Sequence, residues 1–399
     1  MKKIKFFSTD INVREKTILI RLDLNVPFND KKISDTTRID FVLPFLKKLS
    51  SGKAKVVILS HLGRPNGKKI KEMSLYPIFQ YLKKKIGEIV FFLDDEINVN
   101  LKNKISNFKY GDIVLLENIR YYKEEIDNNE KFAKVLASLG DIYINDAFSC
   151  CHRKQASIHE IAKQINSCFA GPLLKKELSS INMILEDKKK PITCILGGSK
   201  ISTKIKIINN LIKKFNNIII VGGMGNTMLK HTGSNIGKSI CENECGSLIK
   251  EILENSKKYN CEITVPKDAI VSTDLNGEGK EKNINEIEEN EMILDIGSKT
   301  ILSIKKIINN SKTILWNGPA GYFENPNFQN GTKKILELIS QKTKNDKIFS
   351  VAGGGETVAA INKFEKFDSF TFVSTAGGAF LEYLEGKTLP AIKALNQND

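Results

Sequence analysis

The sequence predicts an α/β protein made of two doubly wound domains, each a parallel sheet covered by helices on both faces. Short apolar runs alternate with longer stretches of helical periodicity along the whole chain, from "TILIRLDLNV" to "FTFVSTAGG". The runs are nearly continuous in Val, Ile and Leu, which is typical of strands buried on both faces. A helical segment near the middle, "LKKELSSINMILEDKKKP", ends at a proline and divides the runs into two sets. Together these features favour two Rossmann-like, three-layer αβα domains joined by a connecting helix and hinge.

Each half of the chain is expected to hold five or six strands. The apolar runs of the first half lie at 17–26, 54–63, 89–95, 112–120 and 141–148, and those of the second at 191–198, 217–223, 262–271, 313–321, 348–355 and 370–378. We therefore expect an N-terminal domain over 1–174, an interdomain helix over 175–189 and a C-terminal domain over 190–377. The last segment, 378–399, is expected to pack back towards the N-terminal domain.

Composition sets the class of the protein. Of 399 residues, 41% are hydrophobic and 27% charged, which is ordinary for a globular protein. The basic start "MKKIKFFSTDINVREK" lacks the apolar stretch of a signal peptide, and no run is long enough to span a membrane, so a cytoplasmic location is expected. Seven cysteines without regular spacing predict reduced, mostly buried thiols and no structural zinc site.

The net charge of +15 raises a nucleic-acid-binding protein as an alternative. The lysines, however, are spread along the entire chain among Ile and Asn and do not gather in one basic segment. This spread favours lysines on solvated faces over a nucleic-acid footprint.

Arginine is used more selectively. Only six of the 61 basic residues are arginine, and all lie within the first 153 residues. Most follow predicted strands, in "RLDLNVP", "SHLGRP", "ENIRYYKEE" and "NDAFSCCHR", and another lies in "TTRI". Ligands of open α/β sheets bind beyond the carboxyl ends of the strands, and arginine grips carboxylate and phosphate with two parallel hydrogen bonds. Each arginine alone could form a surface ion pair. The strand-end arginines, Arg38 and the histidine of "SHLGRP" together predict a site for a small polyanion.

The strand ends of the second half carry glycines instead: "LGGSK", "VGGMGN", "WNGPAGYFE", "AGGGET" and "STAGGA". Glycine lets a nucleotide approach the backbone, whose N–H groups can meet phosphates. Neither a P-loop nor the GxGxxG of dehydrogenases is present, which disfavours a dehydrogenase. Cys151 and His152 are sequence neighbours and are not expected to form a nucleophile–base pair.

Taken in order, these motifs resemble the phosphoglycerate kinase family. The resemblance rests on "RLDLNVP", "SHLGRP", "LLENIRYYKEE", "NDAFSCCHR", "AGPLLKKEL", "LGGSKISTKI", "WNGPAGYFE", "AGGGET" and "STAGGAFLEYLEGKTLPAIKAL", and covers essentially the whole chain. It implies reversible transfer of the acyl phosphate of 1,3-bisphosphoglycerate to Mg-ADP, giving 3-phosphoglycerate and ATP. It also implies in-line transfer with electrostatic stabilisation, hinge closure that excludes water, Mg²⁺ bound with the nucleotide, and a monomer without nucleic-acid or membrane partners.

The resemblance also assigns residues. The expected 3-phosphoglycerate site comprises Asp23, Leu24, Asn25, Arg38, His61, Leu62, Gly63, Arg64, Arg120 and Arg153. The expected nucleotide site comprises Gly197, Gly198, Lys200, Lys204, Gly222, Asn317, Glu324, Gly354, Gly355, Glu356 and Thr357, with Glu356 approaching the nucleotide-bound Mg²⁺. Catalytic roles are implied for Arg38, Lys200, Gly377 and Gly378.

The chain departs from the family's pattern at four places. Glu356 stands where aspartate is usual, and Thr203 where aspartate is frequent. Ala376 replaces a glycine, which requires that its φ be negative. Cys150 and Cys151 replace small residues. The first two departures bear on the affinity for the metal and not on the type of reaction.

Overall fold

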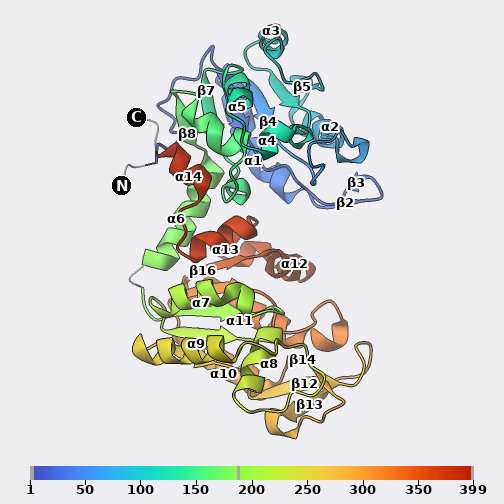
Figure 1. The fold of residues 1–399 in the computed structure, drawn as a ribbon, viewed down its shortest axis with the longest axis vertical. Helices are drawn as coiled ribbons and strands as arrows, with labels where there is room; N and C mark the ends of the chain where they lie inside the picture. The colour runs from blue at the N-terminus through green and yellow to red at the C-terminus, as the bar shows by residue number, and fades with distance from the viewer. Residues whose placement is uncertain (1–3, 187–188, 397–399) are drawn as a thin grey trace. The chain divides into compact units, whose positions relative to one another are not determined.

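The computed structural model describes residues 4–186 and 189–396. The described residues divide into two compact units, which separate between Leu178 and Ser179 and again between Lys387 and Thr388. Unit 1 holds the N-terminal part and a short C-terminal stretch, and unit 2 the part between. Each unit is described by itself below, with the element labels of Figure 1.

Unit 1 is built on a six-stranded parallel sheet in the order β5-β6-β4-β1-β7-β8 (Figure 1). The strands are β1 (Thr17–Arg21), β4 (Lys55–Leu59), β5 (Val90–Leu93), β6 (Ile113–Leu116), β7 (Ile142–Asn145) and β8 (Cys168–Ala170). The five strands expected in this half are present. The sixth, β8, is three residues long and was not expected, because so short a run carries no periodicity to detect.

The helices and the hairpin of unit 1 connect and cover these strands. The helices are α1 (Thr37–Ser51), α2 (Tyr76–Ile86), α3 (Leu101–Ser106), α4 (Lys123–Ile126), α5 (Glu130–Ala137), the first part of α6 (Pro172–Glu186), and α14 (Pro390–Leu395). Strands β2 (Phe28–Asn29) and β3 (Lys32–Ile33) form a small antiparallel hairpin. Apolar side chains of α1 and α2 pack with those of the central strands into one buried core.

Unit 2 contains a second six-stranded parallel sheet, in the order β11-β10-β9-β15-β16-β17. This order is that of the doubly wound dinucleotide fold, in which ligands bind where the strand order reverses, here between β9 and β15. The strands are β9 (Ile192–Leu196), β10 (Asn217–Ile220), β11 (Glu262–Thr264), β15 (Thr313–Asn317), β16 (Phe349–Gly353) and β17 (Phe372–Ser374). The helices are α7 (Ile205–Ile212), α8 (Gly222–His231), α9 (Gly246–Lys258), α10 (Ser298–Asn310), α11 (Asn330–Asp346), α12 (Gly355–Lys363) and α13 (Gly378–Leu384). Two parallel α/β sheets, as expected, are thus present.

The prediction of one strand in this half is wrong. The run 262–271 is not a single strand: β11 ends at Thr264, and β12 (Asp268–Ser272) belongs to a separate antiparallel sheet with β13 (Lys280–Asn283) and β14 (Met292–Ile296) (Figure 1). Pro266 lies between the two strands and lacks the N–H that a continuous ladder would need. The break lets the chain leave one sheet and enter another.

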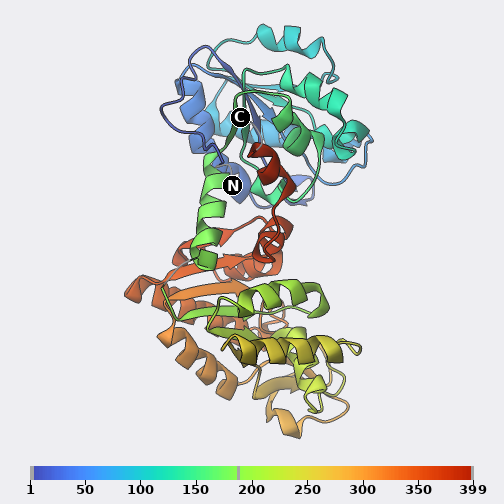
Figure 2. The ribbon, with the colours of Figure 1, turned by 60° about the vertical axis from the view of Figure 1, so that its left-hand side comes forward.

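The divisions between the units differ in position from the expected boundaries. Helix α6 begins at Pro172, not 175, and the division falls inside it; residues 187 and 188 of the expected helix lie outside the described part of the chain. Of the expected terminal segment 378–399, α13 belongs to unit 2 and contacts α7, whereas α14 contacts β8 of unit 1 (Figure 2). A backbone hydrogen bond from Ala391 N–H to the Cys151 carbonyl fixes α14 there. Across the described residues, none of the helices is both long and apolar enough to cross a bilayer.

Candidate active site

The carboxylate of Asp23 organises the polar end of the unit 1 sheet. Asp23 follows β1, and its Oδ2 accepts a hydrogen bond of 2.8 Å from Nη1 of Arg38, at the start of α1. The same Nη1 donates to the Asn25 carbonyl at 2.9 Å, and the Ser149 hydroxyl also donates to Asp23 Oδ2. Burial acts to raise the pKa of Asp23, but Arg38 and these hydrogen bonds bring it below its usual value. Asp23 is therefore an ionised acceptor that holds the Arg38 guanidinium in place.

His61, at the end of β4, is a buried neutral imidazole whose tautomer is fixed by Arg21. Arg21 is fully buried and donates from Nη2 to His61 Nδ1 at 3.1 Å. Burial and this guanidinium hold the pKa of His61 well below its usual value. Because a guanidinium can only donate, Nδ1 is the acceptor and Nε2 carries the proton. His61 is thus arranged to donate a hydrogen bond from Nε2.

A buried chain of hydrogen bonds holds Arg21 itself. Its Nε donates to Ser157 Oγ at 3.0 Å, and Ser157 donates from Oγ and from its backbone N–H to the two oxygens of Glu125, each at 2.7 Å. Glu125 and Ser157 are fully buried. Although Arg21 lowers it, burial raises the pKa of Glu125 above its usual value. Arg21 is the first residue of "RLDLNVP" and is not among the expected site residues; its signal in the sequence is a charged residue at the end of an apolar strand.

Arg120, Arg153 and Arg64 differ in their burial and in their neighbours. Arg120 is buried, donates from Nη1 to the Gly63 carbonyl at 2.9 Å, and keeps Nε without a hydrogen-bond partner. Burial, with Arg21 and Arg153 nearby, lowers the pKa of Arg120 to about 10. Arg64 is exposed, and no contact in the described residues links it to this cluster. The structure therefore brings Arg38 and Arg120 close to His61, with Arg153 near Arg120, whereas Arg64 is the exposed neighbour of Gly63.

The two leucines of the expected site face inward. Leu24 is completely buried and Leu62 is 5% exposed, and both side chains lie in the unit 1 core. Only their backbone groups are available to a ligand. Gly63, in contrast, has a φ of +62°, and its N–H donates to Asn25 Oδ1 at 2.9 Å, which ties the loop after β4 to the loop after β1.

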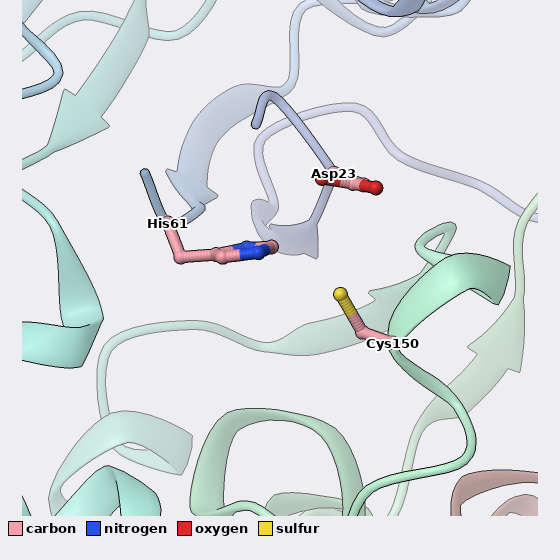
Figure 3. A group of neighbouring side chains, drawn as sticks. All are labelled: Asp23, His61 and Cys150. Atoms are coloured by element: carbon pink, nitrogen blue, oxygen red, sulfur yellow. The ribbon is translucent and has the colours of Figure 1, made fainter. Parts of the chain in front are cut away.

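Asp23, His61 and Cys150 lie close enough to form a three-ligand group, with one ligand atom from each within 4.8 Å of the others (Figure 3). The surroundings do not suit a cation. Nε2 could bind a metal only if its proton moved to Nδ1, which would then face the Arg21 guanidinium as donor against donor. Burial also raises the pKa of the Cys150 thiol, which disfavours the thiolate. This group is better suited to hydrogen-bond an anion than to hold a metal.

In unit 2, Lys204 lies at the carboxyl-terminal edge of the parallel sheet. Its Nζ donates to the Gly197 carbonyl and to Asn317 Oδ1, both at 2.7 Å, which joins the end of β9 to the end of β15. Asn317 Nδ2 in turn donates to the Gly353 carbonyl at 2.6 Å. Burial lowers the pKa of Lys204, while the Glu356 carboxylate opposes that shift. The ammonium therefore lies at the strand-order reversal where ligands of such sheets bind.

Three helices begin with glycine at this edge of the sheet. Helix α8 begins at Gly222, whose φ is +65°; α12 follows Gly354, whose φ is +101°; and α13 follows Gly377, whose φ is +55°. Strands β16 and β17 pair Gly353 with Ser374, so α12 and α13 start from neighbouring strand ends. Gly355 and Gly378 are the first residues of their helices and are exposed. Helix N-termini present free N–H groups that favour anions.

A pocket of about 360 Å³ opens between these elements. One end carries Gly198 and Glu356, and a Cβ added at Gly198 would lie 3.5 Å from Lys204 Nζ and 3.9 Å from Glu356 Oε2. The walls are largely apolar. They include the expected Gly222 and Glu324. Beyond the expected residues, the pocket is lined by neighbours of expected positions, by residues of β14 and by two more distant residues: Ser199, Gly223, Asn226, Pro319, Ala320, Gly321, Tyr322, Met292, Ile293, Leu294, Ile240 and Leu275.

The remaining expected residues of unit 2 are placed as follows. Lys200 is exposed. Burial acts to raise the pKa of Glu242, but hydrogen bonds from Ser202, with the charge of Lys200 as a smaller contribution, bring it below its usual value. Thr357 is buried, and its hydroxyl accepts from the Gly318 N–H at 2.7 Å. The hydroxyl of Thr203 donates to the Lys200 carbonyl at 2.9 Å and supplies no charge. Ala376 is not among the residues with positive φ, as its replacement of glycine requires.

Comparisons with known proteins agree with this architecture over nearly the whole chain. The family model of phosphoglycerate kinase matches residues 8–387. The phosphoglycerate kinase of Methylorubrum extorquens (strain PA1) is 41% identical over 382 residues, covering 95% of each chain. The structure of phosphoglycerate kinase from Coxiella burnetii has a TM-score of 0.90 at 41% identity, covering 98% of this chain and 99% of its own. That of phosphoglycerate kinase from Pyrococcus horikoshii OT3 has a TM-score of 0.83 at 30% identity, covering 98% of both. The chain belongs to the phosphoglycerate kinase family.

Proposed function

We propose that unit 1 binds the phosphoglycerate and unit 2 the magnesium nucleotide in the family's reaction. As a member of that family the chain is a glycolytic phosphotransferase with a carboxyl acceptor. The reaction moves the acyl phosphate of 1,3-bisphosphoglycerate to ADP, giving 3-phosphoglycerate and ATP, and is reversible. The division of roles rests on the different side chains of the two units. Unit 1 gathers arginines and a neutral histidine at its strand ends, and unit 2 gathers a lysine, glycine helix starts and an apolar pocket.

In unit 1 the arginines and His61 would hold the carboxylate and phosphate of the substrate. Arg38 is fixed by Asp23 through a bond of 2.8 Å, so little side-chain freedom remains to be lost on binding. Arg120 has an unpartnered buried Nε, and His61 offers Nε2–H. Asp23 and Asn25 supply acceptors for a substrate hydroxyl. We include Gly63, Arg64 and Arg153 through their place in the family's motifs, and Leu24 and Leu62 through their backbone only.

In unit 2 Lys204 and the starts of α12 and α13 would hold the nucleotide phosphates. Lys200 is exposed, and none of the ion pairs among the described residues includes it, which suits a charge that follows the phosphoryl group as it moves. Gly377 and Gly378 would offer backbone N–H groups to the same group. A divalent cation bound with the nucleotide neutralises phosphate charge, and Glu356 is the acidic side chain placed beside Lys204 and Gly198 to face it.

No general base is needed in this mechanism. The nucleophile is a phosphate oxygen of ADP in one direction and the substrate carboxylate in the other, and both are ionised at neutral pH. An in-line transfer spreads negative charge over the equatorial oxygens, so the protein's contribution is positioning and positive charge. His61 is buried and neutral and serves as a donor, not a base.

The chemistry requires water to be excluded, because an acyl phosphate hydrolyses readily. We propose that the two units close on their ligands during turnover, with the hinge near α6. We further propose a monomer that acts in the cytoplasm without a nucleic-acid or membrane partner. Binding the phosphoglycerate in unit 1 gives the clustered arginines a role that needs no nucleic acid.

A coupled assay tests the proposal. Purified protein receives 3-phosphoglycerate, ATP and a range of Mg²⁺ concentrations, with an enzyme that consumes the acyl phosphate, and ADP release is recorded. Turnover that depends on both substrates and on Mg²⁺ is expected. ADP release without 3-phosphoglycerate, or none at any Mg²⁺ concentration, would contradict the proposed function.

A further inference from the structure

Two fully buried polar residues of unit 1, Glu125 and Ser157, have no part in the mechanism above. They begin a chain of hydrogen bonds that continues through Arg21 to His61 and joins the segments after four neighbouring strands, in the sheet order β6-β4-β1-β7 (Figure 1). Glu125, Ser157 and Arg21 are 0% exposed, and His61 is 3% exposed. A buried guanidinium and a buried carboxylate seldom stabilise a core more than apolar side chains of the same size would. Stability alone therefore does not account for this chain.

The protons along the chain can be assigned because a guanidinium can only donate. Ser157 Oγ accepts from Arg21 Nε at 3.0 Å, so its own proton is directed to Glu125 Oε1 at 2.7 Å. The Ser157 N–H occupies the other carboxylate oxygen, also at 2.7 Å. At the far end His61 Nδ1 accepts from Arg21 Nη2 at 3.1 Å, which leaves the ring proton on Nε2. The carboxylate at one end and the tautomer at the other are thus linked.

Ser157 also sets the direction in which Arg21 points. A guanidinium is planar, and its N–H groups have fixed directions. Nη1 donates to the Leu22 carbonyl and Nε to Ser157 Oγ, so with two nitrogens held, the plane that aims Nη2 at His61 is determined. Ser157 is itself held by the Tyr143 hydroxyl, which donates to its carbonyl at 2.7 Å. Without the Ser157 hydroxyl, Nε loses its acceptor and the plane is no longer fixed.

We propose that Glu125 and Ser157 are positioning residues for substrate binding in unit 1: through Arg21 they keep His61 in the tautomer that donates from Nε2 to an oxygen of the anionic substrate. This inference rests on the proposed function and adds to it two residues that do not touch the substrate. With its proton on Nδ1, His61 would present a lone pair to the anion, acceptor against acceptor. A hydrogen bond to a charged group contributes about tenfold or more in affinity.

Steady-state kinetics of serine variants provide the first test. Ser157→Ala removes the acceptor of Arg21 Nε, whereas Ser157→Thr keeps a hydroxyl there and adds a methyl group to a packed site. The matched control is Ser50→Ala, which removes a buried hydroxyl of the same unit that donates to the Gly111 carbonyl. KM for 3-phosphoglycerate is expected to rise about tenfold in Ser157→Ala and to stay at the wild-type value in the other two. KM for ATP and kcat are expected to be unchanged in all three, because the lost interaction concerns binding in unit 1.

A merely structural role gives a different pattern. The extra methyl group of Ser157→Thr lowers the midpoint of urea denaturation, so a loss of function caused by instability would appear in that variant as well. A wild-type KM for 3-phosphoglycerate in Ser157→Ala, or an equal rise in Ser157→Ala and Ser157→Thr, would overturn the inference.

The tautomer itself can be observed by NMR. Long-range ¹H–¹⁵N spectra of protein labelled with ¹⁵N-histidine distinguish a protonated ring nitrogen from a bare one, and the variant His61→Gln identifies the His61 signals among those of the four histidines. The wild type at neutral pH is expected to show a bare Nδ1 and a protonated Nε2. In Ser157→Ala, and in Glu125→Gln, which sets an NH₂ donor against a donor of Ser157, the Nδ1 signal should move towards that of a protonated nitrogen.

The two levels of the argument fail in different ways. A wild type with the proton on Nδ1, or variants that keep the wild-type tautomer, would overturn this inference while leaving the proposed reaction intact. Absence of turnover that depends on 3-phosphoglycerate in the wild type would instead overturn the proposed function, and this inference with it.

Discussion

Replacing Gly197 with alanine tests the closure of the nucleotide site in unit 2. Gly197 follows β9 directly, and its N–H donates to the Asn317 carbonyl at 2.9 Å. A Cβ added there would lie 1.9 Å from the Pro319 carbonyl oxygen and 2.8 Å from the carbonyl of Gly318. Both obstacles are backbone atoms, which cannot move aside as a flexible side chain would. The two loops at the strand-order reversal must therefore separate by about 1 Å.

Two effects of different size follow from that displacement. Forcing extra atoms into a packed site costs about 1–3 kcal/mol of folding free energy. The shift also separates Lys204 from Asn317, and a misplacement of about 1 Å in a reacting site lowers the rate about 10²-fold. We therefore expect a modest loss of stability together with a large loss of kcat/KM for ATP.

The assay can be confined to unit 2. Trp316 is fully buried in β15 and stacks on Phe370 at 6.0 Å, so its fluorescence during urea denaturation reports the unfolding of this unit. Gly246→Ala is the matched control, because the nearest atom would lie 3.5 Å from the added Cβ, an ordinary contact, and the position opens helix α9 outside the pocket lining. It is expected to stabilise the unit slightly, by about 0.5–1 kcal/mol. A Gly197→Ala protein with the wild-type denaturation midpoint and wild-type kcat/KM would refute the reasoning.

Three further predictions concern charged groups. Arg38→Ala should lower kcat at least ~10²-fold through lost charge stabilisation, with an unchanged circular dichroism spectrum, whereas Arg14→Ala, at a surface position, should leave kcat unaltered; substantial residual turnover would remove Arg38 from the catalytic residues. Glu356→Asp should shift the Mg²⁺ midpoint of the coupled assay, because the shorter side chain changes the reach of the carboxylate beside Lys204, and an unmoved midpoint would mean that Glu356 does not face the metal. Burial raises the pKa of Asp146 from 3.8 to about 7, so the folded state favours the protonated carboxyl. The resulting stability is fully present below about pH 4 and is lost as the pH rises through about 7, on the order of 4 kcal/mol in total. Asp146→Asn should flatten this part of the pH dependence of urea denaturation, and an identical pH profile in the two proteins would show that Asp146 does not titrate in this range.

Most of the parallel strands could be predicted from local sequence. Runs of Val, Ile and Leu predict buried strands because only a strand covered on both faces needs so continuous an apolar pattern. The parallel strands found in both sheets fall on such runs, apart from the short β8. Arginines and glycines after these strands could be assigned to anion-binding edges for the same reason, since the carboxyl ends of parallel strands share one edge.

Other features depend on which segments the fold brings together. The path from Glu125 through Ser157 and Arg21 to His61 joins residues up to 136 positions apart, and exists only because β1 lies between β4 and β7. Arg64 and Arg120 look alike in the sequence, yet one is exposed and the other buried. Burial of this kind is set by the packing of distant elements and not by neighbours in the chain.

The sequence by itself determined the class of the fold, the apolar strands and the kinds of residue available at the two sites, because these follow from periodicity and side-chain chemistry. Only the tertiary structure decided that Pro266 separates two sheets and that His61 carries its proton on Nε2. The physical reason is that the hydrogen-bond partners and the burial of a side chain depend on contacts between residues that are far apart in the sequence.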